Sequence, residues 1–217
     1  MSAIIAVDSQ EPDYTLLQQA ANFLRKGGLL IYPTETFYAL GADHSQAQAL
    51  SRLLQLKGRS ADHTLPLILS QREELTRLCA PGWSQPLVEK LTAEYWPGPL
   101  TLVLPAAFGL HASLCSPPLT AQGASGIALR LSSHPVAHGL AKSLGQAIVS
   151  TSANLTGHPT CAHLDDLAPS LIYGVDIILD GGACVGGCPS TIIELRQGPP
   201  YSIIRQGVLN LPAQLLA

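Results

Sequence analysis

The 217-residue sequence contains few charged and few aromatic residues, and these shortages exclude several classes of protein. Only 12% of the residues are Asp, Glu, Lys or Arg, while 47% are hydrophobic, so the chain has too much core-forming material to be intrinsically disordered. Aromatic residues make up 5%, and the formal net charge is −3. Nucleic-acid binding as the main role is therefore disfavoured, because it usually relies on a basic excess and on aromatic side chains that stack on bases.

The sequence also lacks a long hydrophobic run and a regular pattern of cysteines. No apolar stretch approaches the ~20 residues of a membrane span, and no basic segment followed by an apolar one stands at the start. We therefore expect a cytoplasmic protein with no membrane contact. The five cysteines are widely spaced and odd in number, which argues against a disulfide framework. Cys184 and Cys188 lack two further ligands of suitable spacing, so we expect no protein-held metal.

Patterns typical of helices and of strands alternate along the sequence. Apolar residues at helical spacing predict helices over residues 14–26, 46–59 (broken at Gly58), 71–78, 85–95 and 135–144. Short apolar runs predict strands over residues 29–32, 65–69, 99–106, 126–131, 146–151, 175–182, 190–195 and 201–207. Such alternation is typical of an α/β sheet covered by helices. The last three strands follow one another across short turns, which favours antiparallel pairing there and hence a mixed sheet.

Small polar side chains gather at the ends of several predicted strands. Ser150, Ser152 and Asn154 follow one strand, Thr36 follows another, and Ser190 begins a third. A run of Ser and Thr can be an ordinary loop. It can also line a pocket for an anion or a small polar substrate, because ligands of open α/β sheets bind where the loops at strand ends converge.

Four cations stand close to these segments in the sequence. Lys57 and Arg59 flank Gly58 at a predicted helix end, where they could simply complement the helix dipole. Arg130 and Arg205 each stand in an apolar strand and could face solvent on its outer side. Taken together with the hydroxyls, however, they describe a pocket for an anion, since Arg binds carboxylate or phosphate bidentately and Lys supplies a point charge.

Several catalytic motifs are missing from the sequence. It has no pair of carboxylates with obvious acid/base spacing, no Gly-x-Ser-x-Gly elbow and no phosphate loop that ends in Gly-Lys-Ser/Thr. The chemistry would then rest on positioning and on charge stabilisation, as in phosphoryl or nucleotidyl transfer.

Seven motifs in a fixed order carry the interpretation further. They are YPTETFYALGAD, KGRSADHTLPLIL, WPGPLTLVLPA, IALRLSSHP, STSANLTG, PSTIIEL and IIRQG. Together they resemble the YrdC/Sua5 family of threonylcarbamoyl-adenylate synthases, over residues 16–207. The sequence ends soon after the last motif, so it resembles the short form, and we expect a single YrdC-like domain over residues 1–217.

The resemblance implies a fold and a reaction. The fold is a twisted, open, mixed α/β sheet with flanking helices around a concave cavity. The reaction joins L-threonine, bicarbonate (or CO2) and ATP into threonylcarbamoyl-AMP and releases pyrophosphate, with Mg2+ that arrives with ATP. The product would supply a tRNA threonylcarbamoyl-transfer complex, which makes the t6A base at adenosine 37 of ANN-decoding tRNAs.

The resemblance also assigns two sets of residues. Lys57 and Arg59 form a Lys-x-Arg element that would hold the phosphates and the carbamate and act in catalysis. The residues assigned to ATP are Lys57, Arg59, Ser152, Asn154, Thr160 and Arg205. The residues assigned to threonine are Thr36, Arg130, Ser150 and Ser190, with Arg130 on the substrate carboxylate.

Three positions depart from the family pattern. Ala39 stands where Gly is usual, and Ser60 stands where Pro is usual. Gly126 stands where the family favours Thr, at a position near ATP. We expect Ser125 or a backbone amide to substitute for the missing hydroxyl.

Two other functions stay open. A YciO-like member of the family would bind a nucleotide or RNA without synthase activity, but that type departs from the Lys-x-Arg and Ser-x-Asn patterns that this sequence keeps. A cavity rimmed by Lys and Arg could also attract a tRNA backbone, and weak tRNA binding is compatible with the sequence, although its acidic balance disfavours this as the main role.

Overall fold

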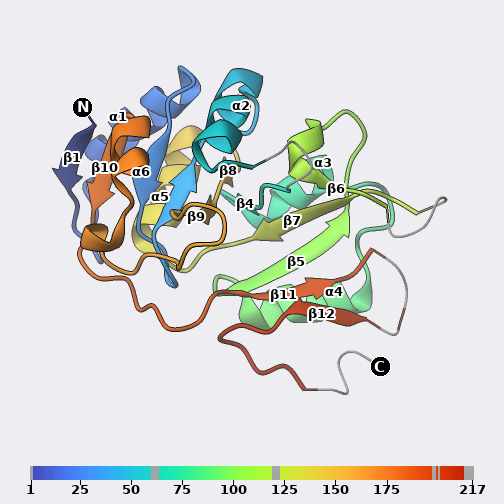
Figure 1. Ribbon diagram of the computed structural model, residues 1–217. Coiled ribbons are helices and arrows are strands. Elements are labelled where there is room, and N and C mark those ends of the chain that lie inside the picture. The colour runs from blue at the N-terminus through green and yellow to red at the C-terminus, as the bar shows by residue number, and fades with distance from the viewer. Residues whose placement is uncertain (1, 60–63, 119–122, 197–198, 200, 213–217) are drawn as a thin grey trace.

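A computed structural model describes residues 2–59, 64–118, 123–196, 199 and 201–212, and its strands form two sheets with helices on their outer faces (Figure 1). The α/β class and the open, mixed pairing with flanking helices are confirmed, with the difference that the strands divide into two sheets. Ser60 lies outside the described residues.

The five-stranded sheet contains the N-terminal strand. Its order is β1 (Ala3–Ala6), β10 (Ile177–Asp180), β2 (Leu30–Tyr32), β3 (Ala39–Gly41) and β9 (Thr151–Ser152). The first three strands are parallel, whereas β3 is antiparallel to both of its neighbours. The segment predicted as a strand over residues 175–182 therefore pairs in parallel in this sheet, and the expectation of antiparallel pairing is wrong for it.

The seven-stranded sheet contains the C-terminal strands. Its order is β12 (Ser202–Arg205), β11 (Thr191–Glu194), β5 (Leu100–Pro105), β7 (Gly126–Arg130), β4 (Leu67–Ile68) and β8 (Ile148–Val149), and β6 (Cys115–Ser116) pairs with β7. β11 is parallel to β5 and β4 is parallel to β7, while the other pairs are antiparallel. The predicted antiparallel pairing of the last two strands, β11 and β12, is confirmed.

Helices cover both sheets. α1 (Tyr14–Arg25) and α5 (Pro135–Leu144) pack together over one face of the five-stranded sheet, and α2 (Ala47–Leu56) and α6 (Pro169–Gly174) lie beside each other (Figure 1). α4 (Pro86–Tyr95) packs behind the seven-stranded sheet. The helix predicted over residues 71–78 is a 3-10 turn (Arg72–Glu74) followed by the one-turn α3 (Leu75–Leu78).

The segment predicted as one strand over residues 146–151 proves to be two. β8 belongs to the seven-stranded sheet and β9 to the five-stranded sheet, so the chain passes from one sheet to the other at Ser150. This crossing brings the hydroxyl-rich segment to the junction of the two sheets. Among the described residues, no helix is long and apolar enough to cross a membrane.

Candidate active site

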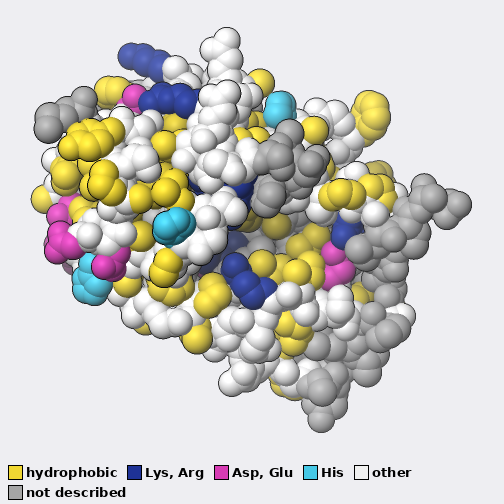
Figure 2. Space-filling view, in the orientation of Figure 1, with side chains coloured by type: hydrophobic (Ala, Val, Ile, Leu, Met, Phe, Trp, Pro, Cys, Tyr) yellow, Lys and Arg dark blue, Asp and Glu magenta, His cyan; other side chains and the backbone are white. Residues whose placement is uncertain are grey.

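A cavity of about 420 Å3 opens where the two sheets meet. Thr36 and Ser152 reach it from the side of the five-stranded sheet, and Thr101 and Arg130 reach it from the seven-stranded sheet. Figure 2 shows the hollow near the centre of the molecule, with Lys and Arg side chains in dark blue within it and at its rim. Groups from two sheets can therefore contact one ligand from different sides.

Side chains on one face of the seven-stranded sheet form the floor of the cavity. Successive side chains of a strand point to opposite faces of the sheet. Leu102, Leu129 and Ile193 pack into the core with α4. Their neighbours in the strands line the cavity: Thr101, Val103, Ala128, Arg130, Ile192 and Glu194. The idea that Arg130 faces bulk solvent is wrong, because its outer face is the cavity and the residue is only 8% exposed.

Ser150 lies at the crossing between the sheets. Its amide donates to the carbonyl of Pro66 at 2.8 Å, which fixes the backbone there. Its Oγ is buried and has no hydrogen-bond partner among the described residues, and the residue lines the cavity. A buried hydroxyl without a partner is unusual, so Ser150 is placed to bond a ligand.

The end of α2 directs Lys57 and Arg59 to different places. Gly58 adopts a positive φ of 62°, and the amide of Arg59 donates to the carbonyl of Leu54 at 2.9 Å, which ends the helix. Arg59 is half-buried and lines the cavity, where Nη1 lies 3.4 Å from the hydroxyl of Thr151. Lys57 is not among the residues that line the cavity.

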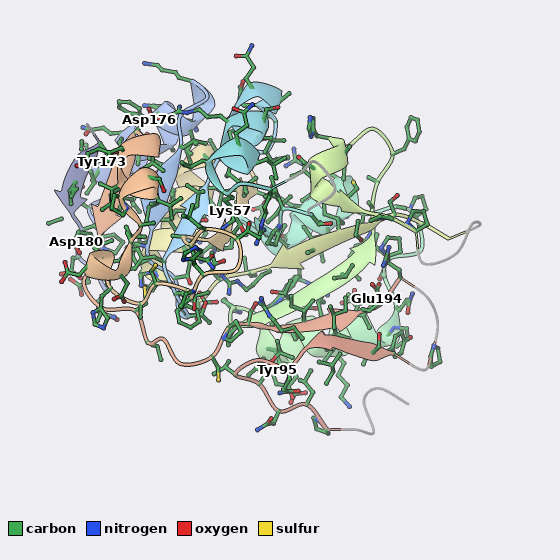
Figure 3. The ribbon with its side chains drawn as sticks, in the orientation of Figure 1. Lys57, Tyr95, Tyr173, Asp176, Asp180 and Glu194 are labelled. Atoms are coloured by element: carbon green, nitrogen blue, oxygen red, sulfur yellow. The ribbon has the colours of Figure 1, made fainter. Side chains whose placement is uncertain are left out.

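Lys57 is instead buried beneath the loop that follows β9 (Figure 3). Its ammonium donates to the backbone carbonyls of Ser152 and Asn154, the second at 2.8 Å. Burial, together with the nearby charge of Arg59, lowers its pKa from 10.5 to about 7. Lys57 stands at the end of α2, as the sequence predicts, but the residue is only 1% exposed and holds the loop from below.

Hydrogen bonds within the loop after β9 hold the side chains of Ser152 and Asn154. Ser152 Oγ donates to Asn154 Oδ1 at 2.5 Å, and Asn154 Nδ2 donates to the carbonyl of His158. Ser152 lines the main cavity, whereas Asn154 lines a second, adjoining hollow. Thr160 borders both hollows.

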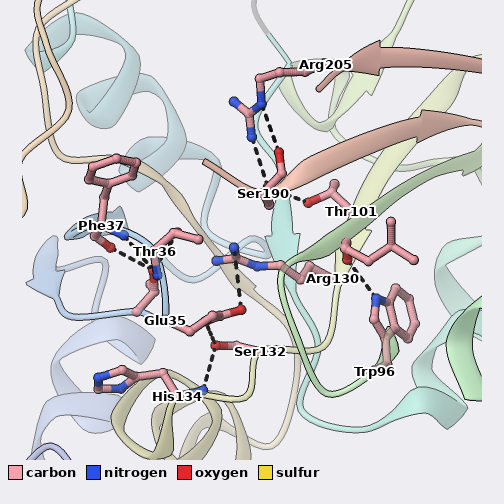
Figure 4. A network of polar contacts seen from close by, with 12 residues as sticks. Glu35, Thr36, Phe37, Trp96, Thr101, Arg130, Ser132, His134, Ser190 and Arg205 are labelled. Carbon is pink, nitrogen blue, oxygen red and sulfur yellow. Dashed lines mark hydrogen bonds and ion pairs between the residues drawn. The ribbon is translucent and has the colours of Figure 1, made fainter. Parts of the chain in front are cut away.

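Arg205 and Ser190 are in direct contact, although the sequence assigned them to different substrates. Arg205 Nη2 donates to Ser190 Oγ at 2.9 Å and its Nε donates to the Ser190 carbonyl at 3.0 Å (Figure 4). Ser190 Oγ also lies 3.0 Å from the hydroxyl of Thr101. Burial, and then the charge of Arg130, lower the pKa of Arg205. Two residues that the resemblance assigns to different substrates, Ser190 to threonine and Arg205 to ATP, therefore lie in one wall of the cavity.

Thr36 stands in a tight turn after β2. Thr34 Oγ1 donates to the carbonyl of Phe37 at 2.7 Å and lies 3.1 Å from Thr36 Oγ1. This local bonding orders the turn and turns the buried Thr36 toward the cavity that it lines. Ala39, one of the departures from the family pattern, is buried in β3 and also lines the cavity.

The space above Gly126 is filled by two residues that the sequence did not single out. A Cβ on Gly126 would lie 2.6 Å from Ser116 Oγ and 2.7 Å from Arg196 Cδ. Ser116 on β6 stands opposite Gly126 in the sheet, and both Ser116 and Arg196 line the cavity. Ser116 thus supplies a hydroxyl where a side chain on residue 126 would stand, a candidate that the expectation of Ser125 missed.

Arg196 is held by a buried ion pair. Its Nη2 and Nε donate to the two carboxylate oxygens of Glu194 at 2.7 and 2.8 Å, and the two side chains are 5% and 7% exposed. Its Nη1 donates to the carbonyl of Pro117. Nothing in the sequence indicated this pair except that Glu194 alternates with the core residue Ile193.

Eight of the ten predicted site residues line the cavity, and Lys57 and Asn154 do not. Sequence reasoning missed Thr101, Ser116, Glu194, Arg196 and the buried Glu35 beneath Arg130. The described residues contain no group of three or more His, Cys, Asp or Glu that could hold a metal ion. The arrangement suits the binding of anions between Arg59, Arg130 and Arg205, with hydroxyls that can hydrogen-bond a small polar molecule.

Comparison with known proteins places the chain in a family. The Sua5/YciO/YrdC family model, described as telomere recombination, matches residues 22–207. The chain belongs to this family. A curated relative from Pyrococcus abyssi, named threonylcarbamoyl-AMP synthase, is 34% identical over 97% of the chain. One of the same name from Thiobacillus denitrificans is 37% identical over 81% of the chain and 89% of the relative.

Solved structures of Sua5/YciO/YrdC members are similar over nearly the whole chain. Sua5 of P. abyssi, solved in complex with L-threonine, has a TM-score of 0.83 at 31% identity and matches 95% of this chain and 58% of its own. YciO of Escherichia coli has a TM-score of 0.81 at 27% identity and matches 97% of this chain and 98% of its own. The chain spans 59% of the length of the P. abyssi relative.

Proposed function

We propose that the protein is an L-threonylcarbamoyladenylate synthase, a nucleotidyltransferase that makes threonylcarbamoyl-AMP and pyrophosphate from L-threonine, bicarbonate or CO2, and ATP. One observation carries the proposal: a single cavity gathers Arg59, Arg130 and Arg205 with the unpartnered hydroxyl of Ser150. The relatives that bear the name of this activity, and a Sua5 structure that contains L-threonine, support it.

Threonine would lie against the floor of the seven-stranded sheet. Arg130 is nine-tenths buried and its guanidinium makes one polar contact among the described residues, so its other donors can bind a carboxylate. The hydroxyls of Ser150, Thr36 and Ser190 would bond the substrate hydroxyl. ATP would lie across Ser152, Thr160, Arg59 and Arg205.

The chemistry needs positioning more than proton transfer by the protein. The amine of threonine attacks the carbon of CO2, an N–C bond forms, and the amine loses a proton, which leaves a carbamate. A carbamate oxygen then attacks the α-phosphorus of ATP, the bond from that phosphorus to the bridging oxygen breaks, and pyrophosphate leaves. Arg59 and Arg205 would offset the charge that builds on the phosphorus and the leaving group.

Lys57 would act on this step through the backbone. Its ammonium holds the carbonyls of Ser152 and Asn154, and thereby the loop that lines the nucleotide side. Mg2+ would enter with the triphosphate. The cavity residues fit this arrangement, because the Glu194 carboxylate is engaged by Arg196 and the lining offers no carboxylate cluster for a resident ion.

The proposal is tested by incubating the protein with ATP, bicarbonate and labelled threonine. We expect labelled threonylcarbamoyl-AMP by chromatography and one pyrophosphate per product, with neither formed when threonine or bicarbonate is left out. Arg59→Ala should keep the fold and lose on the order of 10²-fold in rate, since it removes a charge-stabilising donor. A folded wild-type protein that binds nucleotide without releasing pyrophosphate would instead favour a YciO-like role. The product would be consumed by a tRNA threonylcarbamoyl-transfer complex in the cytoplasm.

A further inference from the structure

Arg130 is supported from behind by a carboxylate that does not line the cavity. Glu35 follows β2 in the five-stranded sheet, and its Oε1 lies 3.6 Å from Arg130 Nη1 at the end of β7 in the other sheet. The two side chains are 12% and 10% exposed. The ion pair therefore joins the two sheets directly beneath the cavity.

Glu35 is itself fixed by a line of polar contacts from α5 (Figure 4). Its Oε2 accepts from the hydroxyl of Ser132, and Ser132 Oγ accepts from the amide of His134 at 3.2 Å. His134 caps α5 by accepting from the amide of Val136 at 3.2 Å. Among the described residues Oε1 has no hydrogen-bond donor, so Arg130 is its polar neighbour.

The second ion pair of the same wall behaves differently. Glu194 accepts hydrogen bonds from Arg196 with both of its oxygens, at 2.7 and 2.8 Å, and this occupies Nε and Nη2 of that guanidinium. Glu35 meets Arg130 with one oxygen at 3.6 Å, and no hydrogen bond to another described residue takes up the remaining donors of Arg130. Arg196 is therefore already paired through two hydrogen bonds with its carboxylate, whereas Arg130 can still bind an incoming anion.

The position of Arg205 gives Glu35 a second role. Arg205 shares the wall with Arg130, and its direct partner is the uncharged Ser190. The two guanidinium groups repel each other, and although Arg205 is itself exposed, the buried Arg130 would be costly without a counter-ion. Glu35 is the carboxylate that offsets this charge on the side away from the ligand.

We propose that Glu35 is a positioning residue: it sets the direction of the Arg130 guanidinium and offsets its charge, so that Arg130 can bind the carboxylate of an amino-acid substrate beside Arg205. The identity of that amino acid rests on the proposed function. The geometry of the pair does not.

The first experiment measures substrate dependence in Glu35→Gln, which keeps the shape and can still accept from Ser132 but loses the charge. The apparent KM for threonine should rise about ten-fold or more, whereas the KM for ATP should change less than about two-fold, and Glu35→Asp should restore part of the loss. Asp176→Asn, which disrupts the distant Arg52–Asp176 pair, is the matched control and should change neither value. Unchanged threonine dependence in folded Glu35→Gln would overturn the proposal.

The second experiment does not depend on catalysis. Arg130→Ala leaves the Glu35 carboxylate buried without its cation, so low-millimolar methylguanidinium should refill the space and raise the melting temperature. The same addition should not raise it in wild type or in Arg130→Ala with Glu35→Gln. Equal responses in the single and double variants would show that Glu35 does not hold the guanidinium. If wild type forms no threonylcarbamoyl-AMP and methylguanidinium still stabilises Arg130→Ala selectively, the proposed function fails and the role of Glu35 stands.

Discussion

Lys57 is a buried cation whose charge is directed at the backbone of a loop. It is 1% exposed, and its ammonium bonds the carbonyls of Ser152 and Asn154. Burial favours the neutral amine, which lowers the pKa to about 7. The buried charge of Lys57 therefore has a free-energy cost that depends on pH, and the residue supports the loop that follows β9.

This cost predicts a pH dependence of stability. The folded-state pKa of about 7 lies below the ordinary value of 10.5, so between these values the unfolded chain binds the proton and the folded chain releases it. Stability should therefore rise with pH in this window, by at most ~1.4 kcal/mol per pH unit from this residue. We expect urea unfolding from pH 7 to 9.5 to show this slope in wild type and a smaller one in Lys57→Met.

The difference between the two slopes isolates Lys57, because both proteins share every other titrating group. Lys57→Met should also be less stable at all pH values in the range, since the two loop carbonyls lose their donor. Parallel pH profiles would mean that the ammonium keeps an ordinary pKa in the folded protein.

At the scale of elements, β6, β7 and β11 form one end of the cavity, where side chains from two of these segments occupy the space next to a glycine in the third. β7 begins with Gly126, and the missing side chain leaves room for Ser116 from β6 and for Arg196, which follows β11. Glu194 then holds Arg196 in that room. The departure from the family pattern at residue 126 is therefore linked to the residues at positions 116 and 196.

Gly126→Ala tests this linkage. Its Cβ would stand 2.6 to 2.8 Å from Ser116 Oγ and from Arg196, closer than a real contact allows. We expect the variant to lose ~1–3 kcal/mol of unfolding free energy through overpacking, measured by chemical denaturation. The same substitution should cost less in a background of Arg196→Ala with Glu194→Gln, which removes the contacts with Arg196 and the charge that would be left unpaired, while the Ser116 hydroxyl stays in place. An equal cost in both backgrounds would show that Arg196 is not what excludes a side chain at residue 126.

At the scale of the molecule, the site exists because two sheets meet. Thr36 and Ser152 belong to one side, and Arg130 and Ser190 belong to the other, and Ser150 lies where the chain crosses between them. A ligand that fills the cavity contacts both sheets and should reduce the opening motions of both.

Hydrogen exchange measured by mass spectrometry can detect this reduction of the opening motions. ATP and threonine added together should slow exchange in residues 34–38 and 150–154 and also in residues 189–192. Ligands should stabilise the folded protein as well, by roughly 2.7 kcal/mol at one hundred times Kd. Protection confined to segments of one sheet would mean that the cavity is not a single two-sided site.

Local patterns in the sequence determined most of the elements and many of the site residues. Helices α1, α2, α4 and α5 and the long strands β5 and β7 are visible in the spacing of apolar residues, because that spacing follows directly from which face is buried. Short strands such as β1, β3 and β6 were missed, since two to four residues carry too little pattern to separate a strand from a loop.

The tertiary structure alone decided how these elements meet. Which sheet β8, β9 and β10 join depends on hydrogen bonds between segments far apart in the chain, and no local periodicity records such partners. The resemblance assigned Lys57 to ATP and the carbamate, and only the fold shows that its side chain is buried under a loop and bonds the backbone there. The sequence determined which side chains carry charge and hydroxyls; the meeting of two sheets determined which of them face a ligand and which, like Lys57 and Glu35, hold the others in place.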